Sequence, residues 1–122
     1  MGWKFKNGIP IYVQIVDEMT TRIANGTYEP GDKLPSVRDL AIEAGVNPNT
    51  MQRALSELER HDLVYAERTS GRFVTDNMDI LERLRKNLVS NYIEDFVREL
   101  QRIGLDRSEI ACAVKHWIEE EK

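Results

Sequence analysis

The sequence predicts a mainly α-helical fold with a small β wing: an N-terminal winged helix-turn-helix followed by a C-terminal two-helix hairpin. Residues 34–61 have the pattern of two short helices joined by a tight turn, and two β-rich runs follow them. Beyond residue 76, apolar residues recur at three- and four-residue steps, which is the spacing of helices. We therefore expect two parts in this chain of 122 residues, at 1–75 and 76–122.

The first predicted helix begins after Pro10, and Asn25-Gly26 supplies a left-handed stop at its end. Its apolar positions recur at helical spacing and comprise Ile11, Ile15, Met19 and Ile23. Residues 29–32 then form a turn signal that leads the chain to the next helix. The segment before Pro10 alternates aromatic and lysine residues, a pattern of an extended arm whose role is open.

The helix-turn-helix pair is predicted by its boundary residues. Ser36 can cap a helix whose third residue is Asp39, and Gly45 ends that helix. Asn47 then caps a second helix, which opens with Pro48 at its first position. A helix that starts in this way presents its N-terminal polar residues to solvent, where a DNA major groove can receive them.

The second helix of the pair separates into an apolar and a polar face. We expect the apolar face, Met51, Ala54, Leu55 and Leu58, to lie in the core. The opposite, polar face carries Asn49, Arg53 and Ser56, and Gln52 and Glu57 flank it. Asn and Gln can bond an adenine edge and Arg prefers guanine, so this face has the chemistry to read double-stranded DNA. A plain solvated face is the alternative.

A β-hairpin is predicted after this helix, with strands at 63–67 and 72–75 and Gly71 free to adopt a positive φ in the turn. Arg68 and Arg72 flank the tip. A basic tip beside a polar helix favours a second DNA contact, along phosphates or in a minor groove. For Arg72, a position on the strand without a DNA contact is the alternative.

The region 76–122 predicts a long helix that ends at Gly104 and a short helix opened by a capping box, Asp106 with Glu109. Two helices with so wide an apolar stripe cannot bury it on each other alone, so we expect a second copy of the chain to cover it. Packing against the first helix of the same chain is the alternative. The predicted dimerisation residues are Leu81, Leu84, Leu88, Tyr92, Phe96, Leu100 and Trp117.

Composition restricts the function further. The formal net charge is −4, so DNA binding must come from locally arranged cations rather than from the charge of the whole chain. Two histidines and one cysteine show no zinc-ligand spacing, and no glycine-rich phosphate loop is present, so we expect no enzyme, no cofactor and no metal.

The sequence predicts a cytoplasmic protein without a membrane partner. It contains no apolar run approaching a membrane span and no N-terminal secretion signal. Cys112 is the only cysteine, which excludes an intramolecular disulfide and suits a reducing compartment. We expect Cys112 to be a small buried residue.

Three sequence segments together resemble the N-terminal domain of the GntR family of bacterial transcription regulators: Pro10-Ile11-Tyr12, the run from Pro30 to Arg38, and Gly45-Val46-Asn47-Pro48-Asn49-Thr50. The resemblance implies that Ser36 and Arg38 grip a phosphate or base edge, that the second helix is the recognition helix, and that Gly71 shapes the wing. Departures at Thr69, Arg72 and His61-Asp62 leave the wing contacts open. With the helix N-termini and the basic tip, the expected DNA-binding set is Ser36, Arg38, Asn47, Asn49, Thr50, Gln52, Arg53, Arg68, Ser70, Gly71 and Arg72.

The short helical C-terminal part resembles the YtrA branch of this family. That resemblance implies a homodimer that reads an inverted-repeat operator, and we expect a repressor. The alternative is a winged-helix module for protein–protein interaction without DNA binding. Whether a small-molecule effector is a further partner stays open, because no constellation of residues identifies one.

Overall fold

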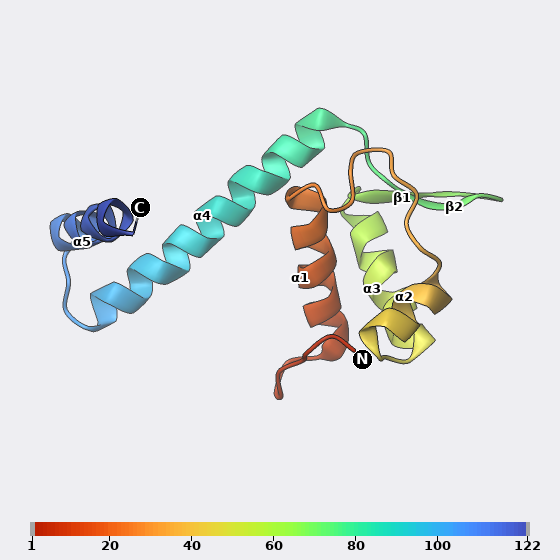
Figure 1. Ribbon diagram of the computed structural model, residues 1–122, viewed down its shortest axis with the longest axis horizontal. Coiled ribbons are helices and arrows are strands. Elements are labelled where there is room, and N and C mark those ends of the chain that lie inside the picture. The colour runs from red at the N-terminus through yellow and green to blue at the C-terminus, as the bar shows by residue number, and fades with distance from the viewer. Residues whose placement is uncertain (1, 122) are drawn as a thin grey trace. The chain divides into compact units, whose positions relative to one another are not determined.

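The computed structural model describes residues 2–121. In these residues the chain forms five helices and one two-stranded antiparallel sheet, which confirms the predicted mainly α fold with a β wing (Figure 1). In chain order the elements are α1 (Ile11–Ala24), α2 (Val37–Ala44), α3 (Pro48–Arg60), β1 (Val64–Glu67), β2 (Gly71–Val74), α4 (Met78–Arg102) and α5 (Arg107–Glu120).

The chain divides into two compact units, one ending at Leu84 and the other beginning at Arg85. We call them the winged unit and the helical unit. Their boundary lies inside α4, nine residues later than the boundary expected from the sequence. The difference has a physical reason, because Leu81 is buried in the core of the winged unit and Leu84 packs against that core.

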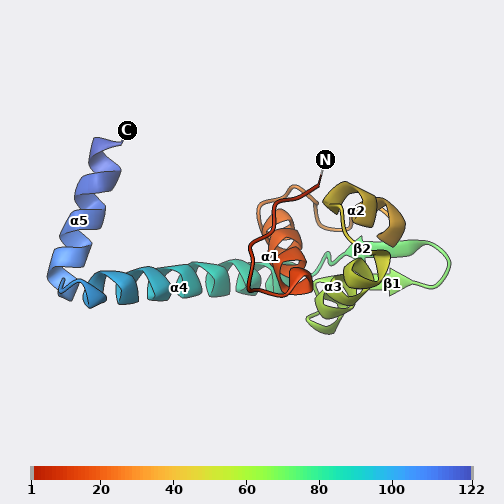
Figure 2. The ribbon, with the colours of Figure 1, turned by 90° about the horizontal axis from the view of Figure 1, so that it is seen from below.

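The core of the winged unit lies where α1 and α2 pack on α3. Figures 1 and 2 show these three helices gathered together, with the free end of the hairpin extending away from them. The largest fully buried side chains are Ile15, Met19, Leu40, Met51, Leu55, Leu58 and Val74. The predicted apolar faces of α1 and α3 therefore supply five of these seven side chains.

The predicted helix boundaries are confirmed by their hydrogen bonds. Ser36 Oγ accepts from the backbone N–H of Asp39 at 3.1 Å, and Gly45 ends α2 in a left-handed conformation with φ +74°. Asn47 Oδ1 accepts from the backbone N–H of Asn49 at 2.7 Å, and Pro48 is the first residue of α3. These bonds satisfy backbone donors that a helix N-terminus leaves without a partner.

The wing is a hairpin in which Tyr65 pairs with Phe73, and their rings stack with centroids 5.7 Å apart. The loop before α2 lies along its second strand. The backbone N–H of Leu34 donates to the carbonyl of Arg72 at 2.9 Å, and that of Val74 donates to the carbonyl of Asp32 at 2.8 Å. The wing is thereby fixed to the segment that leads directly into α2.

The helical unit consists of the remainder of α4 and α5. Gly104 separates the two helices with φ +99°, and the predicted capping box of Asp106 and Glu109 is present. Among the described residues of this unit only Ile110 is buried. Cys112 is exposed in this single chain, so the expectation that it is buried was wrong. Within the helical unit, too few residues pack against α5 to cover Cys112.

Across residues 2–121, no helix has both the length and the apolar character required to cross a membrane.

Candidate nucleic-acid interface

The N-terminus of α2 combines a hydroxyl and a free cation. Ser36 Oγ accepts the capping bond from Asp39, so its hydroxyl proton remains available for an external acceptor. Arg38 is exposed and forms no hydrogen bond or ion pair within residues 2–121. Glu43, an acidic residue on the same helix, bonds Arg22 rather than Arg38, at 3.0 Å. A helix N-terminus with an unpaired guanidinium is suited to a phosphate group.

The N-terminus of α3 offers a second set of polar groups. Asn47 uses its carboxamide oxygen in the cap and keeps its NH₂ group for other acceptors. Asn49 is exposed two residues after the cap, whereas Thr50 is half-buried. The structure therefore leaves donors of Asn47 and Asn49 accessible at the start of the predicted recognition helix.

Further along α3, Gln52 and Arg53 are exposed on the same helix surface. Gln52 donates one N–H to Ser56 Oγ at 3.2 Å, which leaves its other N–H and its carbonyl oxygen to pair with an adenine edge. The guanidinium carbon of Arg53 lies 3.8 Å from the centroid of the Tyr12 ring on α1. Sequence reasoning assigned Tyr12 no role, because its partner is 41 residues away.

Acidic and basic groups pair at the C-terminal half of α3. Glu57 bonds Arg60 at 3.0 Å and lies 3.6 Å from His61. The hydrogen bond from Arg60 is the main cause that lowers the pKa of Glu57 below its ordinary value. Glu57 therefore stays ionised and its charge is largely met by neighbours, so it opposes an approaching phosphate less than an isolated carboxylate would.

The predicted wing residues fall into two environments. Arg68 and Ser70 are exposed at the tip. Arg72 instead pairs with Glu59 on α3, where its side chain is 20% exposed. This ion pair joins the wing to the recognition helix, and Glu59 was missed because 13 residues separate it from its partner. The DNA contact of Arg72 stays a prediction.

Gly71 opens the second strand of the wing with φ +108°, a conformation that side chains rarely adopt. A Cβ atom here would come within 3.2 Å of Cε of Lys33. Lys33 itself forms an isolated β-bridge with Phe73, so it extends the wing by one residue pair. Gly71 thus permits both the positive φ of the turn and the close approach of the Lys33 side chain.

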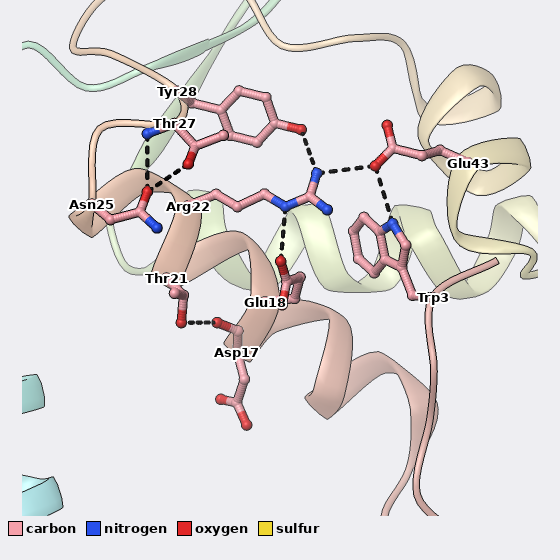
Figure 3. A network of polar contacts seen from close by, with 9 residues as sticks. All are labelled: Trp3, Asp17, Glu18, Thr21, Arg22, Asn25, Thr27, Tyr28 and Glu43. Atoms are coloured by element: carbon pink, nitrogen blue, oxygen red, sulfur yellow. Dashed lines mark hydrogen bonds and ion pairs between the residues drawn. The ribbon is translucent and has the colours of Figure 1, made fainter.

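A polar network around Arg22 fastens α2 to α1 (Figure 3). Arg22 donates to Glu18 at 2.8 Å, to Glu43 at 3.0 Å and to the Tyr28 hydroxyl at 3.2 Å. Trp3 donates through Nε1 to the same Glu43 oxygen at 3.0 Å, and the Arg22 guanidinium lies 4.5 Å from the Trp3 ring centroid. The network includes the arm, whose role was open.

Burial opposes the charged form of Arg22, but its hydrogen bonds to Glu18, Glu43 and Tyr28 outweigh that cost and raise the pKa of the guanidinium. The cation is therefore permanent and acts as a fixed tie between α1 and α2. Because α2 carries Ser36 and Arg38, this tie positions one of the two candidate DNA-contacting helix ends.

The predicted dimerisation residues divide between the two units. Leu81 is buried in the core of the winged unit and Leu84 packs against it, so this end of the stripe is covered within the chain. Leu88 and Leu100 are half-buried. The three aromatic members are exposed: Tyr92 by 64%, Phe96 by 46% and Trp117 by 63%.

The gntR family model of bacterial regulatory proteins matches residues 11–74. Over nearly the whole chain, the sequence is similar to YhcF of Bacillus subtilis, an HTH-type transcriptional regulator, with 39% identity and 98% of each chain covered. It is also similar to the HTH-type transcriptional repressor YtrA of the same organism, with 30% identity over 94% of this chain and 86% of YtrA.

Two solved structures agree with these relatives. A GntR family transcriptional regulator from Listeria monocytogenes superposes with a TM-score of 0.86 at 40% identity, covering 92% of this chain and 98% of that one. The DNA-binding domain of AraR in complex with its operator ORX1 matches 62% of this chain and 90% of its own, with a TM-score of 0.54 and 28% identity. The AraR domain in this second structure is bound to its DNA operator.

Proposed function

We propose that this chain, which belongs to the gntR family of bacterial regulatory proteins, represses transcription as a homodimer bound to an inverted-repeat operator. As a member of that family it is a DNA-binding transcriptional regulator and not an enzyme. The proposal adds the residues that contact DNA, the symmetry of the complex and the sign of the regulation.

The observation that carries the proposal is the exposed surface of α3. Its polar side chains keep hydrogen-bonding edges that no described residue occupies: the NH₂ of Asn47, one N–H and the oxygen of Gln52, and the N–H groups of Arg53. The donor and acceptor of Gln52 suit an adenine edge and the N–H groups of Arg53 suit guanine in a major groove, while the Asn47 NH₂ offers only donors. Ser36 and Arg38 would hold adjacent phosphates.

The wing completes the proposed interface through its exposed tip. We assign a backbone or minor-groove contact to Arg68, Ser70 and Gly71, with Thr50 beside the groove. Arg72, whose side chain is 20% exposed, is assigned as a further contact. The winged unit is then the DNA-binding domain. The local density of cations, rather than the net charge of −4, would supply the electrostatic attraction.

The helical unit is proposed as the dimerisation region. Its large apolar side chains at Tyr92, Phe96 and Trp117 are between 46% and 64% exposed in the single chain, which is unusual for a stable monomer. A two-fold dimer would cover them with the same residues of a second copy and would present two recognition helices to equivalent half-sites. Leu88 and Leu100 extend this surface.

Repression is proposed from the relatives, since YtrA, which covers nearly all of this chain, is named a repressor. The site of action would be the cytoplasm, where bacterial DNA lies. A protein-interaction module is the less favoured function, because it would not require the unoccupied hydrogen-bonding edges on α3.

The experiment that tests this function is selection of bound sequences from a random DNA library, with the mass of the protein measured in solution under the same conditions. Enrichment of an inverted repeat by a dimer is the expected result. Affinity should fall steeply with added salt, because several phosphate contacts release counterions.

A dimer that enriches no sequence at either low or physiological salt would contradict sequence-specific binding and favour the interaction module. Enrichment of a single half-site by a monomer would contradict the homodimer alone. Repression itself is tested by placing the selected repeat over a promoter, where the protein should lower transcription.

A further inference from the structure

The contact between Tyr12 and Arg53 joins α1 to the proposed DNA-reading surface. The guanidinium carbon lies 3.8 Å from the ring centroid, so a half-buried aromatic ring covers one face of an otherwise exposed cation. We infer that Tyr12 is a positioning residue for base recognition, which holds Arg53 so that the edge of its guanidinium meets a guanine. This inference rests on the proposed function.

The geometry suits base reading because stacking and hydrogen bonding use different parts of the same group. An aromatic ring attracts the flat face of a guanidinium, whereas the guanine O6 and N7 acceptors require two N–H groups along its edge. Within residues 2–121, Arg53 forms no hydrogen bond or ion pair. Its position is therefore set by Tyr12 while its donors stay unused.

The neighbouring carboxylate forms no ion pair with Arg53, although the two charges attract each other over a longer distance. Glu57 lies four residues further along α3, a spacing at which a carboxylate often pairs with an arginine. Both of its oxygens instead accept from Arg60, at 3.2 Å and 3.0 Å. The ring of Tyr12 is thus the direct contact that orients Arg53.

Tyr12 is itself fixed by the segment around it. It is the second residue of α1, a helix that packs extensively on α3. Two residues later, the Gln14 carboxamide fastens the preceding arm by accepting from the backbone N–H of Lys6 at 2.8 Å and donating to the carbonyls of Lys6 and Ile9 at 3.0 Å each. The ring is therefore in place before DNA arrives, which reduces the ordering cost of Arg53 on binding.

The test compares Tyr12→Leu with Tyr12→Phe, because only the second keeps an aromatic face. Binding is measured to the enriched operator and to an operator changed at the base pair where Arg53→Ala loses discrimination. The ratio of these two affinities is used because a smaller folded fraction lowers both equally. We expect Tyr12→Leu to reduce the ratio by about two- to fivefold, the strength of an exposed cation–π contact, and Tyr12→Phe to leave it unchanged.

The double variant isolates the coupling between the two residues. In the Arg53→Ala background, Tyr12→Leu should cause no further loss of discrimination. A loss of equal size in that background would overturn the inference, as would a Tyr12→Leu protein that binds all DNA more weakly with an unchanged ratio.

The failure of the inference and the failure of the proposed function give different results. If the wild-type protein discriminates and Arg53→Ala loses that discrimination while Tyr12→Leu keeps it, only the role of Tyr12 is overturned. If the wild-type protein enriches no sequence, or if Arg53→Ala discriminates as the wild type does, the assigned reading surface is wrong and the inference falls with it.

Discussion

The winged unit and the helical unit bury their apolar residues to very different degrees. The winged unit closes a core in which Ile15, Met19 and Leu58 are completely inaccessible to solvent. The helical unit buries Ile110 and leaves Tyr92 and Trp117 almost two-thirds exposed. A similar density of apolar residues therefore produces a self-sufficient fold in one unit and an incomplete surface in the other.

The difference follows from the number of elements that meet. In the winged unit, α1, α2 and β1 each contact α3, so the apolar face of every helix finds a partner. In the helical unit, two helices leave most of the apolar surface of α4 uncovered. Stability in the first unit should depend on packing within the chain, and stability of the second on association.

The largest expected effect on stability comes from a substitution in the core of the winged unit. Leu55→Ala removes a side chain that is 1% exposed, so the transfer and cavity costs should lower the free energy of unfolding. We expect a loss of about 2–5 kcal/mol in urea denaturation, compared at one protein concentration. Ile42→Ala, at a position 68% exposed on α2, is the control and should change it by less than about 0.5 kcal/mol. If Leu55→Ala and Ile42→Ala lowered the free energy of unfolding equally, the assignment of Leu55 to the core would be contradicted.

The next effect concerns the open surface. Leu88→Asp places a charge in the proposed interface and should abolish dimerisation and operator affinity together, measured by sedimentation and by DNA binding. The dimer should weaken by at least about 2 kcal/mol, the loss typical of a central interface residue. Asn87→Asp adds the same charge one position away and should leave the mass unchanged. A Leu88→Asp protein that stays dimeric would remove Leu88 from the interface.

A smaller effect is expected at the N-terminus of α2. Arg38→Ala should lower affinity by about 1–3 kcal/mol for many sequences alike and should reduce the dependence of binding on salt, because a phosphate contact carries no sequence information. Titration with the operator and a scrambled duplex measures both. Arg107→Ala removes one positive charge from the helical unit instead and should change neither the affinity nor its dependence on salt. If Arg107→Ala lowered the affinity as much as Arg38→Ala does, only the total charge of the protein would matter.

The smallest effect separates two roles of Arg72. Glu59→Gln and Arg72→Gln each break a partly exposed ion pair and should each cost up to about 1 kcal/mol of folding stability in thermal denaturation. Operator affinity should fall only for Arg72→Gln, because Glu59→Gln keeps the cation. If both variants lost affinity equally, Arg72 would act only by holding the wing to α3.

Local features of the fold could be predicted from the sequence because they depend on near neighbours. Ser36, Asn47 and the pair of Asp106 with Glu109 mark helix starts within three residues of the groups they bond. The apolar period of α3 identified all four of its buried residues. The burial of Leu81 in the core of the winged unit could not be predicted locally, because it depends on distant parts of the chain.

The parts of the candidate site that escaped prediction join residues far apart in sequence. The contacts of Tyr12 with Arg53, of Glu59 with Arg72 and of Trp3 with Glu43 each depend on how separate elements pack. Residue type and spacing identify a polar helix face, but they do not indicate which neighbour orients each side chain on it. An alternating arm such as residues 3–6 gives no local signal of its partner.

The two backbone hydrogen bonds between the wing and residues 32–34 have a consequence for the kinetics of DNA binding. Leu34 lies two residues before the Ser36 cap, so the position of the wing relative to the N-terminus of α2 is closely restricted. If both ends contact DNA as proposed, the second end would bind as an intramolecular event at high effective concentration once the first has met the duplex. Release would then require both contacts to open within one short interval, which would lengthen the residence time of each winged unit on its proposed half-site.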